Sequence, residues 1–199
     1  MSEILEPRIR ICVISGSIRP GNYTSMAVNI ALDALSGCPG IGVDLVAPEK
    51  LDLPFPGSGR ETEDQAWLKD QVQSATGVIL ATPEYHGSFS SVMKLVIENL
   101  GFPSVLSGKP VSLLGVAGGS IGAIKSLEQL RSVCSHVGAI VLPGPVSIAN
   151  VRETFSANGD LLDESIRKRI ERLVEHHLDY IDRHVCPQYA LESMVRQKN

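Results

Sequence analysis

The residues best suited to chemistry in this 199-residue chain form a polar cluster directly after an apolar stretch near the N-terminus. Ser17, Asn22 and Thr24 supply hydrogen-bonding side chains, and Arg19 supplies a positive charge. A helical pattern begins at the end of the cluster, and the unpaired N–H groups of a helix N-terminus favour phosphate. An arginine strengthens such a site through charge-assisted hydrogen bonds. The cluster therefore predicts an anion site, although a tight turn with a capped helix and a solvated Arg19 would use the same residues.

A second polar segment, residues 82–88, follows another apolar stretch. Pro83 stiffens its backbone, and Gly87 permits a close approach of other groups. Backbone N–H groups of such a ledge can bind a flat polar ring while Tyr85 packs nearby. A structural loop would have the same composition. His86 is more simply a solvent-facing loop residue, because the sequence assigns it no carboxylate partner.

A third segment, residues 115–120, contains Gly118 and Gly119 and has minimal side-chain bulk. Paired glycines allow a flat ligand to lie close to the backbone, so this segment could form a second wall of a pocket. Glu84, in the second segment, fits a helix-capping or surface role as well as a binding role. In the first cluster, the glycine spacing matches neither a Gly-Lys-Ser/Thr phosphate loop nor G-x-G-x-x-G, so nucleotide hydrolysis is not indicated.

The elements that must position these segments alternate along the chain. Apolar runs predict strands at residues 9–14, 43–46, 78–81, 111–114 and 139–142. Helical periodicity predicts helices at residues 24–36, 61–75, 91–100, 123–137 and 163–181, the last with Asp163 as N-cap.

Five strands that alternate with five helices predict a doubly wound parallel sheet with helices on both faces. The strand order 2-1-3-4-5 uses every element, whereas the six-stranded dinucleotide order needs a further βα unit and a G-x-G-x-x-G turn. We therefore predict a flavodoxin-like, three-layer α/β fold with a five-stranded parallel sheet. Ligands of such sheets bind beyond the carboxyl ends of the strands, where the three segments would converge.

Composition limits the class of protein. A length of 199 residues with 43% hydrophobic content predicts a single domain over residues 1–199. A net charge of −4 gives no reason to expect nucleic acid as a partner. No apolar stretch is long enough to span a bilayer and residues 1–7 lack the features of a secretion signal, so we expect a cytoplasmic protein without a membrane partner. Residues 196–199 are expected to fray.

The four cysteines are widely spaced and predict reduced thiols rather than a disulfide or a metal site. They are Cys12, Cys38, Cys134 and Cys186. Cys12 falls in an apolar strand and Cys134 on the apolar face of a helix, where cysteine behaves as a small hydrophobic residue.

The motifs resemble those of a known family. The pattern Gly16-Ser17-x-Arg19 with Asn22 and Thr24, followed by residues 83–88 and Met93-Lys94, is similar to the NADPH-dependent FMN reductase family of flavodoxin-like proteins. The similarity runs from about residue 8 to residue 142. It implies FMN as cofactor and NADPH or NADH as co-substrate. The residues expected to bind the flavin are Ser17, Arg19, Asn22, Tyr23, Thr24, Pro83, Glu84, Tyr85, His86, Gly87, Ser88, Gly118 and Gly119.

The resemblance also implies a homodimer or homotetramer with the flavin close to a subunit interface. Two departures from the family pattern stand out. His86 occupies a position where family members often have asparagine, and Met93-Lys94-Leu95 stands where they often have Leu-Lys-Asn. The first is expected to alter contacts at the ring edge or substrate preference.

The expected reaction is hydride transfer from NAD(P)H to FMN, and then electron transfer to a quinone, to another small-molecule acceptor or to a flavin-accepting monooxygenase. No side chain need act as acid, base or nucleophile, so we predict no catalytic residue and no metal. Two alternatives remain. A flavodoxin-type electron carrier would share the fold and cofactor without NAD(P)H oxidase activity, and a flavin-free binding module could use the same scaffold.

Overall fold

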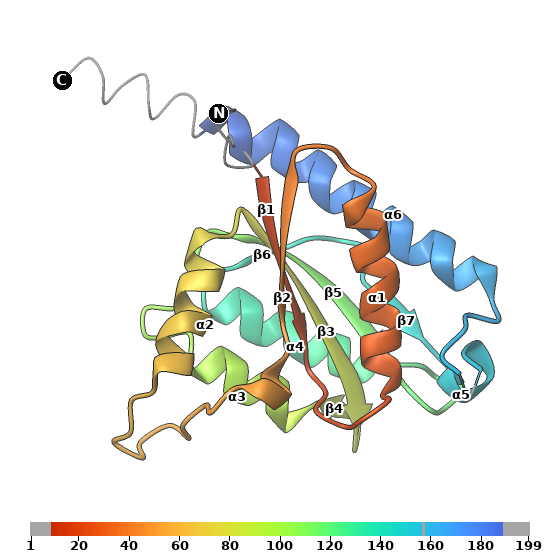
Figure 1. The fold of residues 1–199 in the computed structure, drawn as a ribbon, viewed down its shortest axis with the longest axis horizontal. Coiled ribbons are helices and arrows are strands. Elements are labelled where there is room, and N and C mark those ends of the chain that lie inside the picture. The colour runs from red at the N-terminus through yellow and green to blue at the C-terminus, as the bar shows by residue number, and fades with distance from the viewer. Residues whose placement is uncertain (1–8, 157, 189–199) are drawn as a thin grey trace, which may run out of the picture.

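The structure, a computed structural model that describes residues 9–156 and 158–188, is built around a parallel β-sheet (Figure 1). Its main strands lie in the order β2-β1-β3-β5-β6, and each neighbouring pair is parallel. In chain order this is 2-1-3-4-5, which confirms the predicted flavodoxin-like fold. The strands are β1 (Ile9–Ser15), β2 (Ile41–Val46), β3 (Gly77–Tyr85), β5 (Pro110–Val116) and β6 (Ile140–Val141). Residues 1–7 and 196–199, which carried two expectations, lie outside the described residues.

Helices cover both faces of the sheet, which gives the three predicted layers (Figure 1). One face carries α1 (Tyr23–Ser36) and α6 (Glu164–Tyr180), and α6 continues into a π-helical turn, η2 (Ile181–Val185). The other face carries α2 (Glu63–Ser74), α3 (Ser91–Glu98) and α4 (Ile124–His136). The segment between β2 and α2 contains one short helix, η1 (Pro48–Lys50). Within the described ranges, no helix has both the length and the hydropathy to cross a membrane.

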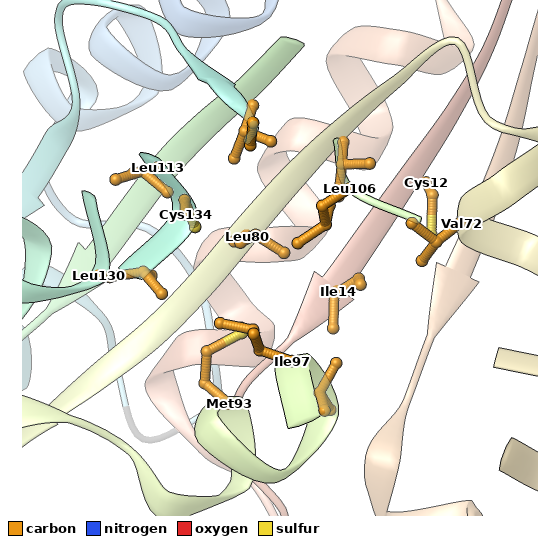
Figure 2. Packing of buried hydrophobic residues seen from close by; sticks show 14 of the residues in the cluster. Cys12, Ile14, Val72, Leu80, Met93, Ile97, Leu106, Leu113, Leu130 and Cys134 are labelled. Atoms are coloured by element: carbon orange, nitrogen blue, oxygen red, sulfur yellow. The ribbon is translucent and has the colours of Figure 1, made fainter. Parts of the chain in front are cut away.

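Alternate residues of the central strands point to opposite faces and so build two apolar cores. On β1, Cys12 and Ile14 pack with α2, α3 and α4, whereas Ile11 and Val13 pack with α1 and α6. Figure 2 shows the first of these cores, in which Cys12, Ile14 and Leu80 are all buried. Strands buried on both faces form near-continuous apolar runs, which is why the sequence located them.

The buried cysteines have the structural role that the sequence predicts. Cys12 and Cys134 are fully buried in the core of Figure 2. Burial raises the pKa of both thiols to about 12. The thiols therefore stay protonated at neutral pH and behave as small hydrophobic side chains.

The second polar segment is a β-hairpin rather than a loop. β3 continues through Tyr85, and the chain then turns back as β4 (Ser88–Phe89), which pairs antiparallel with the end of β3. The prediction ended the strand at residue 81 because the following residues are polar and include Pro83. These residues remain extended because β4 and β5 pair with their backbone.

The edge of the sheet after β5 also differs from the prediction. Only Ile140–Val141 of the predicted strand at residues 139–142 forms β6, and a second short strand, β7 (Val146–Ile148), continues along β5. Pro143 and Pro145 separate the two strands, since proline donates no hydrogen bond to a β-ladder. A short helix, α5 (Val151–Thr154), follows β7 and was not predicted.

Candidate flavin-binding site

A cleft of about 430 Å³ lies at the carboxyl ends of β1, β3 and β5, and all three predicted segments contribute to its lining. Its volume lies in the range of about 300–1,000 Å³ that is typical of small-molecule sites. The predicted residues that line it are Ser17, Arg19, Asn22, Tyr23, Thr24, Pro83, Glu84, Tyr85 and Gly118. Four further predicted residues are not among its lining residues: His86, Gly87, Ser88 and Gly119.

The first loop, residues 16–22 between β1 and α1, is held tightly against β3. The amide of Gly16 donates to the carbonyl oxygen of Ala81 at 2.6 Å. A Cβ atom on Gly16 would lie 2.7 Å from that oxygen and 3.0 Å from the side chain of Met93. Only glycine fits this close approach, so Gly16 determines where the loop leaves the sheet.

Ser17 provides the most specific feature of the cleft. Its side chain is only 2% exposed, and its hydroxyl has no hydrogen-bond partner among the described residues. An unpaired buried hydroxyl costs free energy, and such groups are rare in folded proteins. A ligand oxygen in the cleft would satisfy it.

The start of α1 lies in the same part of the cleft. The amides of Tyr23 and Thr24 belong to its first turn, where N–H groups have no acceptor within the helix. This first turn contains no acidic side chain, so the positive end of the helix dipole is not neutralised. Both residues line the cleft, where their backbone can bind an anion.

Asn22 has a structural role in this loop. Its Oδ1 accepts the amide of Ser25 at 2.8 Å as the N-cap of α1, and its Nδ2 donates to the carbonyl oxygen of Arg19 at 2.7 Å. Both ends of the amide are therefore engaged within the loop. We expect Asn22 to shape the anion site, and direct contact with a ligand stays a prediction.

Glu84 caps a helix, which is one of the roles that the sequence left open. Its Oε2 accepts the amide of Ser126 at 3.3 Å, in the first turn of α4. The N-cap of α4, Ala123, has no side-chain cap of its own. The carboxylate of Glu84 therefore stabilises the positive end of α4 while it lines the cleft.

The turn of the hairpin, residues 86 and 87, is held by α4. His86 and Gly87 both have positive φ, at 51° and 74°, and they join the paired residues Tyr85 and Ser88. Gln129 of α4 donates to the carbonyl oxygen of Gly87 at 3.0 Å and accepts the hydroxyl of Ser88 at 2.6 Å. The side chain of Ser88 is thus engaged with α4, and His86 is exposed at the turn.

The third loop, residues 117–123 between β5 and α4, is hydrogen-bonded to the end of β7 and the start of α5. The amide of Ala117 donates to the carbonyl oxygen of Ile148 at 2.9 Å. The amide of Val151 donates to the carbonyl oxygen of Ala117 at 3.1 Å. Gly118 is exposed, and a Cβ atom there would meet nothing within 4 Å. This loop therefore offers open backbone at the cleft, as a flat ligand would require.

Six further lining residues were not predicted as binding residues. Pro20, Gly21, Val116 and Ala117 lie within the predicted segments, whereas Val151 and Arg152 lie outside them. The most consequential is Arg152 on α5, because it adds a second guanidinium to the cleft. The β-branched pattern of Val146 and Ile148 indicates a short strand beside β5. That strand would have placed residues 149–152 at the carboxyl edge of the sheet.

The histidine with a strongly lowered pKa, His177, lies away from the cleft. His177 of α6 is fully buried, and its Nδ1 lies 2.8 Å from the hydroxyl of Ser112 on β5. A Cβ atom on Gly77, at the opposite end of β3 from the cleft, would lie 2.3 Å from its Nε2. Burial lowers the pKa of His177 to about 4, so it is neutral at physiological pH. No group of three side chains in residues 9–156 and 158–188 has the arrangement of a metal site.

The fold and the cleft together define a flavodoxin-like protein whose cleft includes the N-terminus of α1. A family model described as NADPH-dependent FMN reductase matches residues 9–153. The chain therefore belongs to this family, which confirms the resemblance and the predicted class of flavin-dependent oxidoreductase.

Individual relatives agree with this assignment. An NAD(P)H-dependent FMN reductase of Pseudomonas aeruginosa is 29% identical over 178 residues, which cover 84% of this chain and 92% of the relative. A 2-hydroxy-1,4-benzoquinone reductase of a Burkholderia species is 27% identical over 187 residues, which cover 89% and 99%. The solved structure of FerB, a flavoenzyme NAD(P)H:(acceptor) oxidoreductase from Paracoccus denitrificans, has a TM-score of 0.75 at 23% identity and covers 88% of this chain and 98% of its own.

Proposed function

We propose that the cleft binds FMN, with the phosphate at the first loop and the ring between the hairpin and the third loop. The observation that carries this proposal is the buried hydroxyl of Ser17, which has no partner among the described residues and lies in the same cleft as the N-terminus of α1. A phosphate oxygen there would satisfy the hydroxyl, and the helix dipole and Arg19 would stabilise its charge. Membership of the FMN reductase family supports the same cofactor.

In this proposal the protein's own residues bind and orient FMN and the nicotinamide co-substrate. When bound, the flavin supplies the chemistry of accepting a hydride from NADPH or NADH and passing electrons onward. Pro83 and Tyr85 form one side of the cleft, and the backbone at Gly118 forms another that a ring can approach closely. No side chain is assigned as acid, base or nucleophile in this mechanism.

The acceptor is a small molecule. The Burkholderia relative is a quinone reductase and the Pseudomonas relative an FMN reductase, so quinones and free flavin are the acceptors to test first. The reduced flavin could also leave the cleft to serve a flavin-accepting monooxygenase.

We also propose that the protein is a homodimer or homotetramer. Two large apolar side chains of the cleft loops support this proposal, since Ile18 is 51% exposed and Ile121 is 73% exposed. A second subunit packed over these loops would remove this apolar surface from water. Sedimentation analysis of the purified protein would detect the oligomer, and a monomer at all concentrations would contradict the proposal.

One assay tests the proposed activity. Purified protein is mixed with NADPH or NADH, with and without FMN, and then with a quinone. We expect the absorbance of the reduced nicotinamide to fall, and the decrease to depend on flavin. If the protein binds FMN but oxidises neither nicotinamide, it is an electron carrier. If it neither carries nor binds flavin, it is a binding module without flavin.

A further inference from the structure

The cleft contains a second arginine to which the family motifs assign no role. Arg152 lines the cleft together with Arg19. Neither side chain forms an ion pair with a carboxylate in the part of the chain that the structure describes. Among the residues that the structure describes, Glu84 is the one acidic residue that lines the cleft, and it accepts an amide of α4. The lining is therefore cationic in a protein of net charge −4, which favours an anionic ligand.

The backbone around Arg152 is fixed relative to the cleft. The amide of Asn150 donates to the carbonyl oxygen of Gly119 at 3.1 Å, and that of Val151 donates to Ala117 at 3.1 Å. Asn150 adopts a left-handed conformation with φ of 44°, which turns the chain from β7 into α5. Val151 is buried between these contacts. The backbone at Arg152 is therefore held in place by its neighbours, and its side chain can adjust to a ligand.

Contacts of the residue after α5 place this helix beside the N-terminus of α1. The ring of Phe155, the residue after α5, packs against the ring of Tyr23 with centroids 6.1 Å apart. Tyr23 is the first residue of α1, so α5 lies next to the helix N-terminus where the phosphate is expected. No hydrogen bond between described residues ties α5 to the hairpin at residues 83–89.

We propose that Arg152 is a second phosphate-binding residue, which holds the terminal phosphate monoester of FMN together with Arg19. This inference rests on the proposed function, because it requires FMN in the cleft. A phosphate monoester carries close to two negative charges at neutral pH, since its second pKa is about 6. Two guanidinium groups match that charge, and each can form paired hydrogen bonds with phosphate oxygens. Arg152 would thus help the protein to select FMN over riboflavin, which has no phosphate.

Flavin titrations of variants test this role. We expect Arg152→Ala to weaken FMN binding about tenfold to hundredfold, the usual effect of losing a charge-assisted hydrogen bond, and to leave riboflavin binding unchanged. Arg152→Lys should recover part of the loss, because lysine keeps the charge but not the planar fork. Arg172→Ala is the matched control, since Arg172 is an exposed arginine of α6 outside the cleft lining, and it should bind FMN like the wild type.

The pH dependence gives a second readout. Wild-type affinity for FMN should rise between about pH 5 and 7 as the phosphate loses its second proton. The rise should be smaller in Arg152→Ala, because one of the two cations that respond to the extra charge is missing.

Two results would overturn the inference. One is an equal loss for FMN and riboflavin in Arg152→Ala. The other is unchanged FMN affinity in that variant, which together with a raised KM for NADPH would assign Arg152 to the dinucleotide. These results differ from a failure of the proposed function, in which the wild-type protein itself would not bind FMN.

Discussion

The hydroxyl of Ser90 donates to the carbonyl oxygen of Gly16 at 2.5 Å and so joins the start of α3 to the first loop of the cleft. The same hydroxyl accepts the amide of Met93 at 3.0 Å as the N-cap of α3. Ser90 is buried, and its own amide donates to the hydroxyl of Thr82 on β3. The first loop is therefore held in place by β3 and α3, through contacts that lie outside the cleft that it lines.

Substitution of two glycines should separate the shape of this loop from the space for a ligand. Gly16→Ala places a Cβ atom 2.7 Å from the carbonyl oxygen of Ala81, so we expect a loss of about 1–3 kcal/mol of unfolding free energy and weaker flavin binding. Gly118→Ala meets no atom within 4 Å, and its effect on stability should stay within about 0.5 kcal/mol. Its methyl group would still reduce the affinity for FMN and for riboflavin alike.

Urea denaturation and flavin titration of both variants check these outcomes. A Gly16→Ala variant as stable as the wild type would mean that the loop can shift away from β3. Unchanged flavin affinity in Gly118→Ala would place the ring away from the third loop.

Ser17→Ala should have opposite effects on the free protein and on flavin binding. The hydroxyl has no partner among the described residues, so its removal should leave the free protein as stable as before or slightly more stable. FMN affinity should fall by about 1.5–3 kcal/mol if the hydroxyl donates to the phosphate. Thermal unfolding without flavin and a fluorescence titration with FMN measure the two effects. A parallel loss of stability and affinity would assign Ser17 a structural role instead.

Arg19→Ala should weaken FMN far more than riboflavin. The guanidinium lines the cleft at the first loop, and only FMN carries the phosphate that it would bind. The expected loss for FMN is about 1.5–3 kcal/mol, the value of a hydrogen bond to a charged group. Isothermal titration with both flavins makes the comparison, and similar losses for the two ligands would count against the phosphate assignment.

His86→Asn should stabilise the hairpin without changing flavin affinity. A two-residue turn with positive φ at both positions favours Asn-Gly, and this chain has His-Gly there. The asparagine that family members often carry at this position therefore fits the turn itself. We expect a gain of up to about 0.5 kcal/mol in chemical denaturation. A change in FMN affinity or in acceptor preference would instead place His86 at the ring edge, as the resemblance to the family implies.

Stability should fall as the pH drops from about 6.5 towards 4 because of His177. Burial lowers its pKa to about 4 in the folded protein, whereas an unfolded histidine titrates near pH 6.5. The unfolded state therefore binds more protons in this interval, which disfavours folding as the pH falls, by a total on the order of 3 kcal/mol.

A variant isolates this effect of His177 from other titrating groups. His177→Asn cannot titrate but keeps a polar atom near the hydroxyl of Ser112, so its stability should change less between pH 6.5 and 4. Urea denaturation across this range compares the two proteins. Equal pH dependence would mean that other groups control acid unfolding.

Much of the fold could be predicted because the information is local. Central strands such as β1 are buried on both faces, so their sequences are apolar runs. The N-caps Asn22 and Asp163 stand where the helical patterns begin. The hairpin was missed because β3 and β4 hold its polar residues extended by pairing with each other. The short β7 was missed because β5 supplies the partner that so short a strand needs.

The strand order and the edge of the sheet where the cleft lies were both predicted from the sequence and are confirmed, whereas an anion site with Ser17 and Arg19 stays a prediction. Three features could be found only in the folded chain: Glu84 caps α4, Gln129 holds the hairpin, and Arg152 lines the same cleft. The physical reason is that each of these depends on a contact between segments distant in sequence. A residue's type shows which bonds it can form, whereas its partner depends on how the sheet and helices pack.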